Sequence, residues 1–143
     1  MHSGSSLPGT RRERWGKAAI FAGLTAALPS VWQTVTHVTD ETYRAPEVRH
    51  GEGHVQYHMA REALITAGAL GAVVVATTAG ARRGRALWRC LALSTTGFTA
   101  AMWSGGPVTG VWAPNRKALL IHVGSTTGLA LGTWLLRPRK ENS

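Results

Sequence analysis

The chain has 143 residues, one cysteine, and 16 lysines and arginines against 7 acidic residues. The length predicts a single domain, residues 1–143, and the lone Cys90 excludes an intrachain disulfide and the dithiol chemistry of disulfide or quinone reductases. A basic chain can bind nucleic acid. Here the basic residues lie at the ends of apolar stretches, so we expect the membrane lipid bilayer as partner and no nucleic acid.

Four apolar stretches follow one another along the chain. Each has about 17–19 residues, which is the length that a helix needs to cross roughly 30 Å of hydrocarbon. The predicted fold class is therefore all-α, an integral membrane four-helix bundle. The four predicted spans are residues 18–35, 63–79, 87–103 and 118–136.

The N-terminal region allows two interpretations. Residues 1–10 are rich in Gly and Ser and are expected to be disordered. Pro29 should kink the outer third of the first span, because proline removes a helix hydrogen bond. Residues 11–30 also have the basic start and short apolar core of a cleaved signal peptide. Trp32 and the apolar run to Val35 favour an uncleaved span.

Basic residues lie in three clusters that an even number of spans places on one side of the membrane. That side carries eleven basic residues and the other side five, which predicts that both termini are cytoplasmic. We therefore expect a multi-pass protein of the plasma (inner) membrane, with residues 36–56 and 105–116 outside. The clusters are Arg11, Arg12, Arg14 and Lys17; Arg82, Arg83, Arg85 and Arg89; and Arg137, Arg139 and Lys140.

Small residues recur at every fourth position on two of the spans. Such stripes let membrane helices approach closely. They predict either packing inside the bundle, which we favour because four short spans must first pack on each other, or a homo-oligomer. The stripes are Gly124, Gly128 and Gly132, and Ala63, Ala67 and Gly71.

The connection after the first span carries most of the ionisable side chains. Five of the seven acids and four of the six histidines lie within residues 37–62. A helix that resumes near Glu52 would align several of them on one stripe. His122 lies about one turn inside the last span, so three elements bring ionisable groups to one depth, where such groups usually face a bundle interior or a wet cavity. The stripe is His50, His54, His58 and Glu62, and we expect its inner members to converge with His37 and His122 in one outer pocket.

In the first interpretation this pocket is an acid/base centre. Glu62, partly buried, would be the acid and His58 its proton partner, with His122 and Asp40 completing the catalytic set. The apolar cavity below would hold a lipophilic substrate. The substrate-binding residues would be His37, Trp32, Trp103 and Trp112. The indole faces of the three tryptophans can stabilise positive charge.

Other interpretations stay open. A metal such as zinc or copper could be bound by His54 and His58, which share a helix face, with Glu62 or His37 as the next ligand. A haem could be ligated axially by His58 and His122, in an accessory or electron-transfer subunit. A solvated surface and a small-solute or ion carrier are further alternatives. The sequence identifies no cofactor.

Two resemblances bear on these alternatives. The plan of four short spans rich in small residues resembles small four-helix bacterial membrane proteins of the DoxX-like kind and related uncharacterised families. The pair His58 and Glu62, separated by three residues, resembles the catalytic helix of the EXPERA-type sterol isomerases, in which a His and a Glu help to shift a double bond through a carbocation. Some membrane terpene cyclases similarly use paired acids under aromatic side chains. The likeness implies isomerisation or cyclisation of an isoprenoid-like substrate, with Asp40 or Glu41 folding back to supply the second acid.

Overall fold

The computed structural model describes residues 10–41 and 53–138, and the regular structure in these residues is entirely helical. The predicted all-α class is therefore confirmed. The predicted disorder of residues 1–10 falls on residues outside the described ones, with the exception of Thr10. The long helices are α1 (Arg11–His37), α2 (His54–Thr78), α3 (Arg85–Trp103) and α5 (Arg116–Leu135), and the short ones are η2 (Gly80–Arg82) and α4 (Gly105–Thr109).

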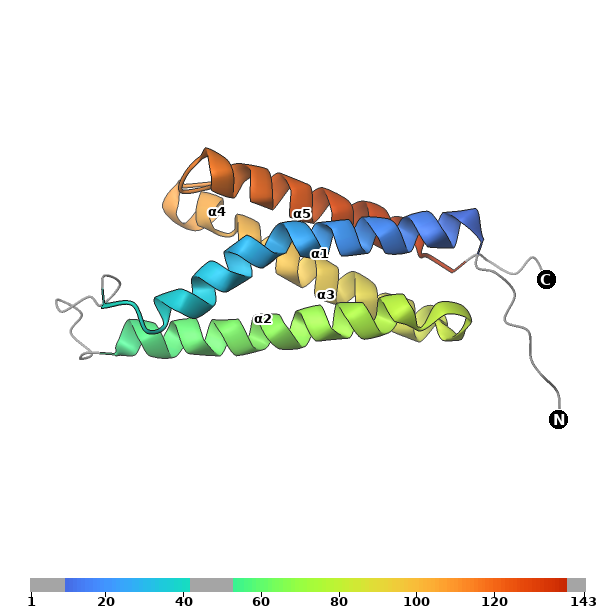
Figure 1. Ribbon diagram of the computed structural model, residues 1–143, viewed down its shortest axis with the longest axis horizontal. Helices are drawn as coiled ribbons and strands as arrows, with labels where there is room; N and C mark the ends of the chain where they lie inside the picture. The colour runs from blue at the N-terminus through green and yellow to red at the C-terminus, as the bar shows by residue number, and fades with distance from the viewer. Residues whose placement is uncertain (1–9, 42–52, 139–143) are drawn as a thin grey trace.

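Successive long helices run in opposite directions along the molecule (Figure 1). The most extensive packing is between α1 and α5; α2 packs on α1 and α3, and α3 packs on α5. These four contacts close a ring, as in a four-helix bundle. We call the end formed by residues 10–17, 80–89 and 135–138 the basic end, and the end formed by residues 32–41, 53–62 and 103–122 the histidine end.

Local sequence explains several helix boundaries. The Thr10 hydroxyl accepts a hydrogen bond from the Glu13 amide (3.3 Å) and the Asn115 side chain accepts one from Ala118 (2.9 Å), so both satisfy amides that a helix start leaves free. The helix predicted to resume near Glu52 begins at His54, after Gly53 with a φ of 87°. That left-handed conformation favours glycine.

Glycines allow α1 and α5 to pack backbone against backbone. A Cβ atom added to Gly128 would lie 2.7 Å from the Cα atom of Gly23 and 2.8 Å from the Ala19 carbonyl oxygen. The Ser125 hydroxyl donates to the Gly23 carbonyl (3.1 Å), which satisfies it inside this contact. Interior packing is thus confirmed for Gly128 and Gly132 of the stripe on α5, whereas Gly124 is exposed. Around Gly71 on α2, by contrast, nothing lies within 4 Å of an added Cβ, so homo-oligomerisation through that stripe stays a prediction.

Pro29 separates two parts of α1. The buried residues of this helix, Gly16, Ile20, Gly23 and Ala27, all precede it. Figure 1 shows α1 bending along its length, so that its last turns approach the start of α2. The kink that Pro29 predicts therefore directs the end of α1 away from the tight contact with α5.

Three helices, α1, α2 and α5, are long and apolar enough to cross a membrane. The predicted third span, residues 87–103, forms α3, which is long enough but less apolar because Arg85 and Arg89 lie in its first turns. In the most apolar 18-residue stretch of each helix, only 17% of α1, 11% of α2 and 17% of α5 is buried. Large apolar side chains such as Leu64 and Leu120 therefore cover the outside of the molecule.

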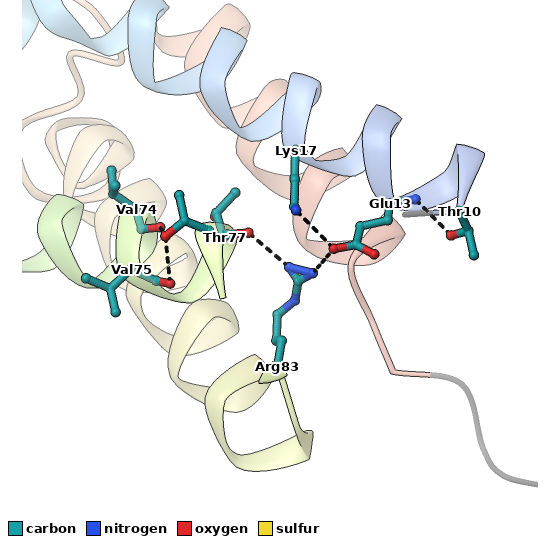
Figure 2. A network of polar contacts seen from close by, with 8 residues as sticks. Thr10, Glu13, Lys17, Val74, Val75, Thr77 and Arg83 are labelled. Atoms are coloured by element: carbon teal, nitrogen blue, oxygen red, sulfur yellow. Dashed lines mark hydrogen bonds and ion pairs between the residues drawn. The ribbon is translucent and has the colours of Figure 1, made fainter. Parts of the chain in front are cut away.

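A polar network joins α1, the end of α2 and the link between η2 and α3 at the basic end (Figure 2). The Arg83 guanidinium donates to a carboxylate oxygen of Glu13 (3.2 Å) and to the Thr77 carbonyl oxygen (3.3 Å). Lys17 approaches the same carboxylate oxygen at 3.1 Å. The Arg83 side chain is only 5% exposed, so Glu13 neutralises a charge that the fold has removed from solvent.

Candidate functional site

The first histidine group lies on the opening turns of α2. The Nε2 atoms of His54 and His58 are 3.2 Å apart, and the rings meet edge to face with centroids 4.5 Å apart. The Tyr57 ring also meets the His58 ring edge to face, with centroids 5.4 Å apart. Both histidines are exposed, so a partner molecule can reach the pair.

Glu62 lies one turn beyond His58 and is exposed. The partial burial predicted for Glu62 is therefore absent. The predicted contact between the two side chains is not formed either, because the His58 ring turns toward His54 at the preceding turn. Within residues 10–41 and 53–138 the Glu62 carboxylate has neither a hydrogen bond nor an ion pair.

The second group, which we call the aromatic cluster, consists of Trp103, Trp112 and His122. The His122 ring stands edge to face with Trp103, with centroids 5.3 Å apart and planes at 72°. The ring centroids of Trp112 and Trp103 are 6.5 Å apart. The Trp112 ring also covers Gly106 so closely that a Cβ atom would not fit there. His122 is half-buried, and its Nδ1 atom is buried without a hydrogen-bond partner among the described residues. The cluster thus holds a sequestered, unsatisfied imidazole nitrogen.

The two groups lie on helices that are not neighbours in the ring. The extensive contacts of α2 are with α1 and α3, and those of α5 are with α1 and α3. In the described part of the chain no hydrogen bond, ion pair or ring contact joins His122 to His58 or Glu62. Convergence of these residues around one substrate stays a prediction.

The remaining predicted residues lie at the end of α1 and just beyond it. His37 is the last residue of α1 and is half-buried, as is Asp40, which follows it. Trp32 is 70% exposed, so its indole faces outward. Glu47, His50 and Glu52 lie outside the described residues.

The described residues bring together two of the three predicted metal ligands and do not bring together the two predicted haem ligands. In residues 10–41 and 53–138, no three His, Cys, Asp or Glu side chains are grouped to hold a metal ion. The Nε2 atoms of His54 and His58 lie side by side, 3.2 Å apart. Axial haem ligation by His58 and His122 would need side chains from two helices that are not packed on each other.

The structure also reveals polar residues that the sequence analysis did not single out. Trp88 donates its indole N–H to the Thr133 carbonyl oxygen (2.9 Å), and the Thr95 and Thr133 hydroxyls are 3.1 Å apart in the buried contact of α3 with α5. Arg12 donates to the Trp134 carbonyl oxygen at 3.0 Å. Tryptophan near the end of an apolar stretch is a local sequence signal for a membrane interface, but the partners of Trp88 and Trp134 come from distant parts of the sequence.

No family model matches the chain, and neither a curated protein nor a solved structure matches it. The resemblances to DoxX-like proteins and to EXPERA-type isomerases therefore stay hypotheses that depend on the quoted residues.

Proposed function

We propose that the chain is a multi-pass protein of the plasma (inner) membrane that crosses it four times, with both termini in the cytoplasm. The exposed apolar surfaces of α1, α2 and α5 support this proposal, since such surfaces are stable in hydrocarbon. The excess of basic residues at the basic end supports a cytoplasmic location for that end. The less apolar α3 would cross with them because it packs on both α2 and α5.

We further propose that the histidine end binds a lipophilic, isoprenoid-like molecule and catalyses its isomerisation or cyclisation by proton transfer. The observation that carries this proposal is the buried, unpartnered Nδ1 atom of His122 beside Trp103. An imidazole exchanges protons near neutral pH. The indoles of Trp103 and Trp112 would stabilise the positive charge that develops on the alkene.

The proton balance of the proposed isomerisation is simple. One alkene carbon gains a proton, which leaves the positive charge on the other alkene carbon. The next carbon along the chain then loses a proton, so the double bond moves by one position without net gain or loss of atoms. His122 is the candidate for one of these transfers. Glu62 and His58, one turn apart on α2, are the candidates for the other, with Asp40 assisting and with His37 and Trp32 contacting the substrate.

Deuterium incorporation tests this proposal directly. The purified protein in lipid nanodiscs is incubated in D₂O with farnesol, geranylgeraniol and squalene, and the products are analysed by mass spectrometry. We expect His122→Gln and Glu62→Gln to lower the rate of incorporation by roughly 10²–10⁴-fold. Arg116→Gln, an exposed residue at the same end, is the control and should retain the wild-type rate. No incorporation by the wild type, or equal rates in wild type and His122→Gln, would exclude the proposal.

The pair His54 and His58 favours a second candidate function, metal binding. Two nitrogens that are each about 2.0–2.1 Å from a tetrahedral zinc ion lie roughly 3.3 Å apart, close to the 3.2 Å between these Nε2 atoms. Isothermal titration with Zn²⁺ and Cu²⁺ tests it, with metal analysis and absorption near the haem Soret band of the protein as purified. We expect His54→Gln and His58→Gln to abolish binding and His122→Gln to retain it. Equal binding by all three variants would exclude this site.

A further inference from the structure

A groove runs between α3 and α5 at the basic end. Its first part has a volume of about 210 Å³ and is lined by Arg85, Trp88, Arg89 and Arg137, with Pro138. Its second part, of about 380 Å³, shares Trp88 and Arg137 with the first. It continues along both helices past Thr96, Thr99 and Ala130. We call the two parts together the α3–α5 groove.

Positive charge is concentrated in the first part of the α3–α5 groove. Arg85 and Arg89 lie one turn apart on α3, and Arg137 follows α5. No acidic side chain lines either part. In the described part of the chain the side chains of Arg85 and Arg89 make neither a hydrogen bond nor an ion pair. The Arg83 side chain, by contrast, binds Glu13. Three neighbouring guanidinium groups without a carboxylate repel one another. A phosphate group relieves that repulsion, because its oxygen atoms accept hydrogen bonds from the paired N–H groups of each guanidinium.

Trp88 connects the charged part to the less polar part. Its indole N–H is held by the Thr133 carbonyl oxygen at 2.9 Å, and the Arg137 guanidinium lies over its ring at 5.9 Å. The Thr95 hydroxyl donates to the Leu91 carbonyl oxygen and also contacts the Thr133 hydroxyl. Trp88, Thr95 and Thr133 thus have their polar groups satisfied within the bundle, and the exposed surface of the second part is mainly apolar, so it suits a hydrocarbon chain.

We infer that the α3–α5 groove binds one anionic phospholipid. Its phosphate would contact Arg85, Arg89 and Arg137, and one acyl chain would lie between α3 and α5 toward Ala130. A soluble phosphate compound would use only the first part of the groove, whereas a phospholipid matches both. The inference rests on the proposed insertion of the helices in a membrane, with the basic end at the surface of the cytoplasmic leaflet, where anionic lipids are concentrated.

Native mass spectrometry of the detergent-purified full chain tests the charged part. The protein is titrated with dioleoyl phosphatidylglycerol and, separately, with dioleoyl phosphatidylcholine. We expect one phosphatidylglycerol to be retained preferentially. Each arginine near an anionic lipid contributes about fivefold in affinity, so Arg85→Gln/Arg89→Gln should bind it about thirtyfold more weakly. The control Arg14→Gln/Arg82→Gln removes the same charge from the same end outside the groove and should retain the preference.

Two further arms identify the source of the phosphate and test the groove itself. Glycerol phosphate, which has the headgroup chemistry but no acyl chain, should not displace phosphatidylglycerol. Ala130→Phe keeps every charge but fills the second part of the groove, and should reduce retention of the lipid. Circular dichroism of each variant checks folding, which we expect to be retained because Arg85, Arg89 and Ala130 are exposed.

Several results would overturn the inference. These are an unchanged lipid preference in Arg85→Gln/Arg89→Gln, displacement by glycerol phosphate, full retention in Ala130→Phe, or an equal loss in the Arg14→Gln/Arg82→Gln control. Carbonate extraction of cell membranes tests the membrane proposal separately. A protein that carbonate releases is not inserted, whatever its lipid preference, whereas an inserted protein without the preference refutes the lipid site alone.

Discussion

The basic end and the histidine end of this bundle use their polar residues differently. At the basic end, charged and indole groups join helices that are distant in sequence, as in the contacts of Arg83 with Glu13 and of Trp88 with Thr133. At the histidine end, His54 contacts His58 on the same helix, and Glu62 is exposed. The difference indicates that polar contacts hold distant segments together at the basic end, whereas Glu62 and the Nδ1 atom of His122 have no partner within the described residues.

Helix packing follows the same division. The glycine contacts between α1 and α5 lie before Pro29, in the half of α1 nearer the basic end, where backbones touch. Beyond Pro29 no residue of α1 is fully buried. The histidine end is therefore held by fewer buried contacts, which is typical of regions that open locally at low free energy.

The largest effect is expected from breaking the α1–α5 contact with Gly128→Ala. The new Cβ atom would lie 2.7 Å from the backbone of Gly23, so the helices must move apart. Overpacking of a backbone contact should lower the free energy of unfolding by about 3 kcal/mol. Thermal unfolding of the detergent-purified protein, followed by far-ultraviolet circular dichroism, measures it.

Gly124→Ala provides the matched control on the same face of α5. Its Cβ atom would lie 3.6 Å from the Ala26 Cβ, an ordinary contact, and alanine is the better helix former by up to about 1 kcal/mol. This variant should therefore be as stable as the wild type or more so. Similar destabilisation by both substitutions would show that the close contact of α1 with α5 is not what holds the bundle.

An intermediate effect is expected from Glu13→Gln at the basic end. The substitution leaves the buried Arg83 guanidinium with a neutral partner, and an uncompensated buried charge is destabilising. Because Glu13 itself is 23% exposed, we expect a loss of about 2 kcal/mol. The control is Lys17→Gln, whose side chain is 35% exposed. It should change the free energy of unfolding by less than about 1 kcal/mol in the same measurement. Equal stability of Glu13→Gln and wild type would refute a structural role for this network.

The sequence predicted the four long helices and their order because apolar length and the polar segments between apolar stretches are local signals. It did not predict the short helices η2 and α4. It also predicted that Gly128 and Gly132 pack inside the bundle, since a helix with small residues every fourth position offers a flat face. The partners of that face, Gly23 and Ile20 on α1, were not predictable. They depend on how two helices more than a hundred residues apart are aligned.

The candidate site was only partly predictable for a related reason. Spacing places His54, His58 and Glu62 on one stripe of α2, but it does not say which way the stripe faces. Because α2 is apolar on most of its surface, its own sequence does not distinguish an inner from an outer side. Packing on α1 and α3 decides this and leaves Glu62 exposed. The edge-to-face contact of His122 with Trp103 likewise depends on the packing of α5 against α3, which the local sequence does not specify.

The smallest effect on stability is expected at the histidine end, from His58→Ala and Glu62→Gln. Both side chains are exposed, and the Glu62 carboxylate has no hydrogen bond or ion pair within the described residues. Exposed substitutions of this kind change the free energy of unfolding by less than about 0.5 kcal/mol, and the same thermal measurement checks this. A loss in Glu62→Gln as large as that in Glu13→Gln would mean that Glu62 has a structural partner, and the contrast between the two ends would disappear. With stability unchanged, any loss of proton transfer or metal binding in these variants belongs to the chemistry of the side chains, because the folded population is the same.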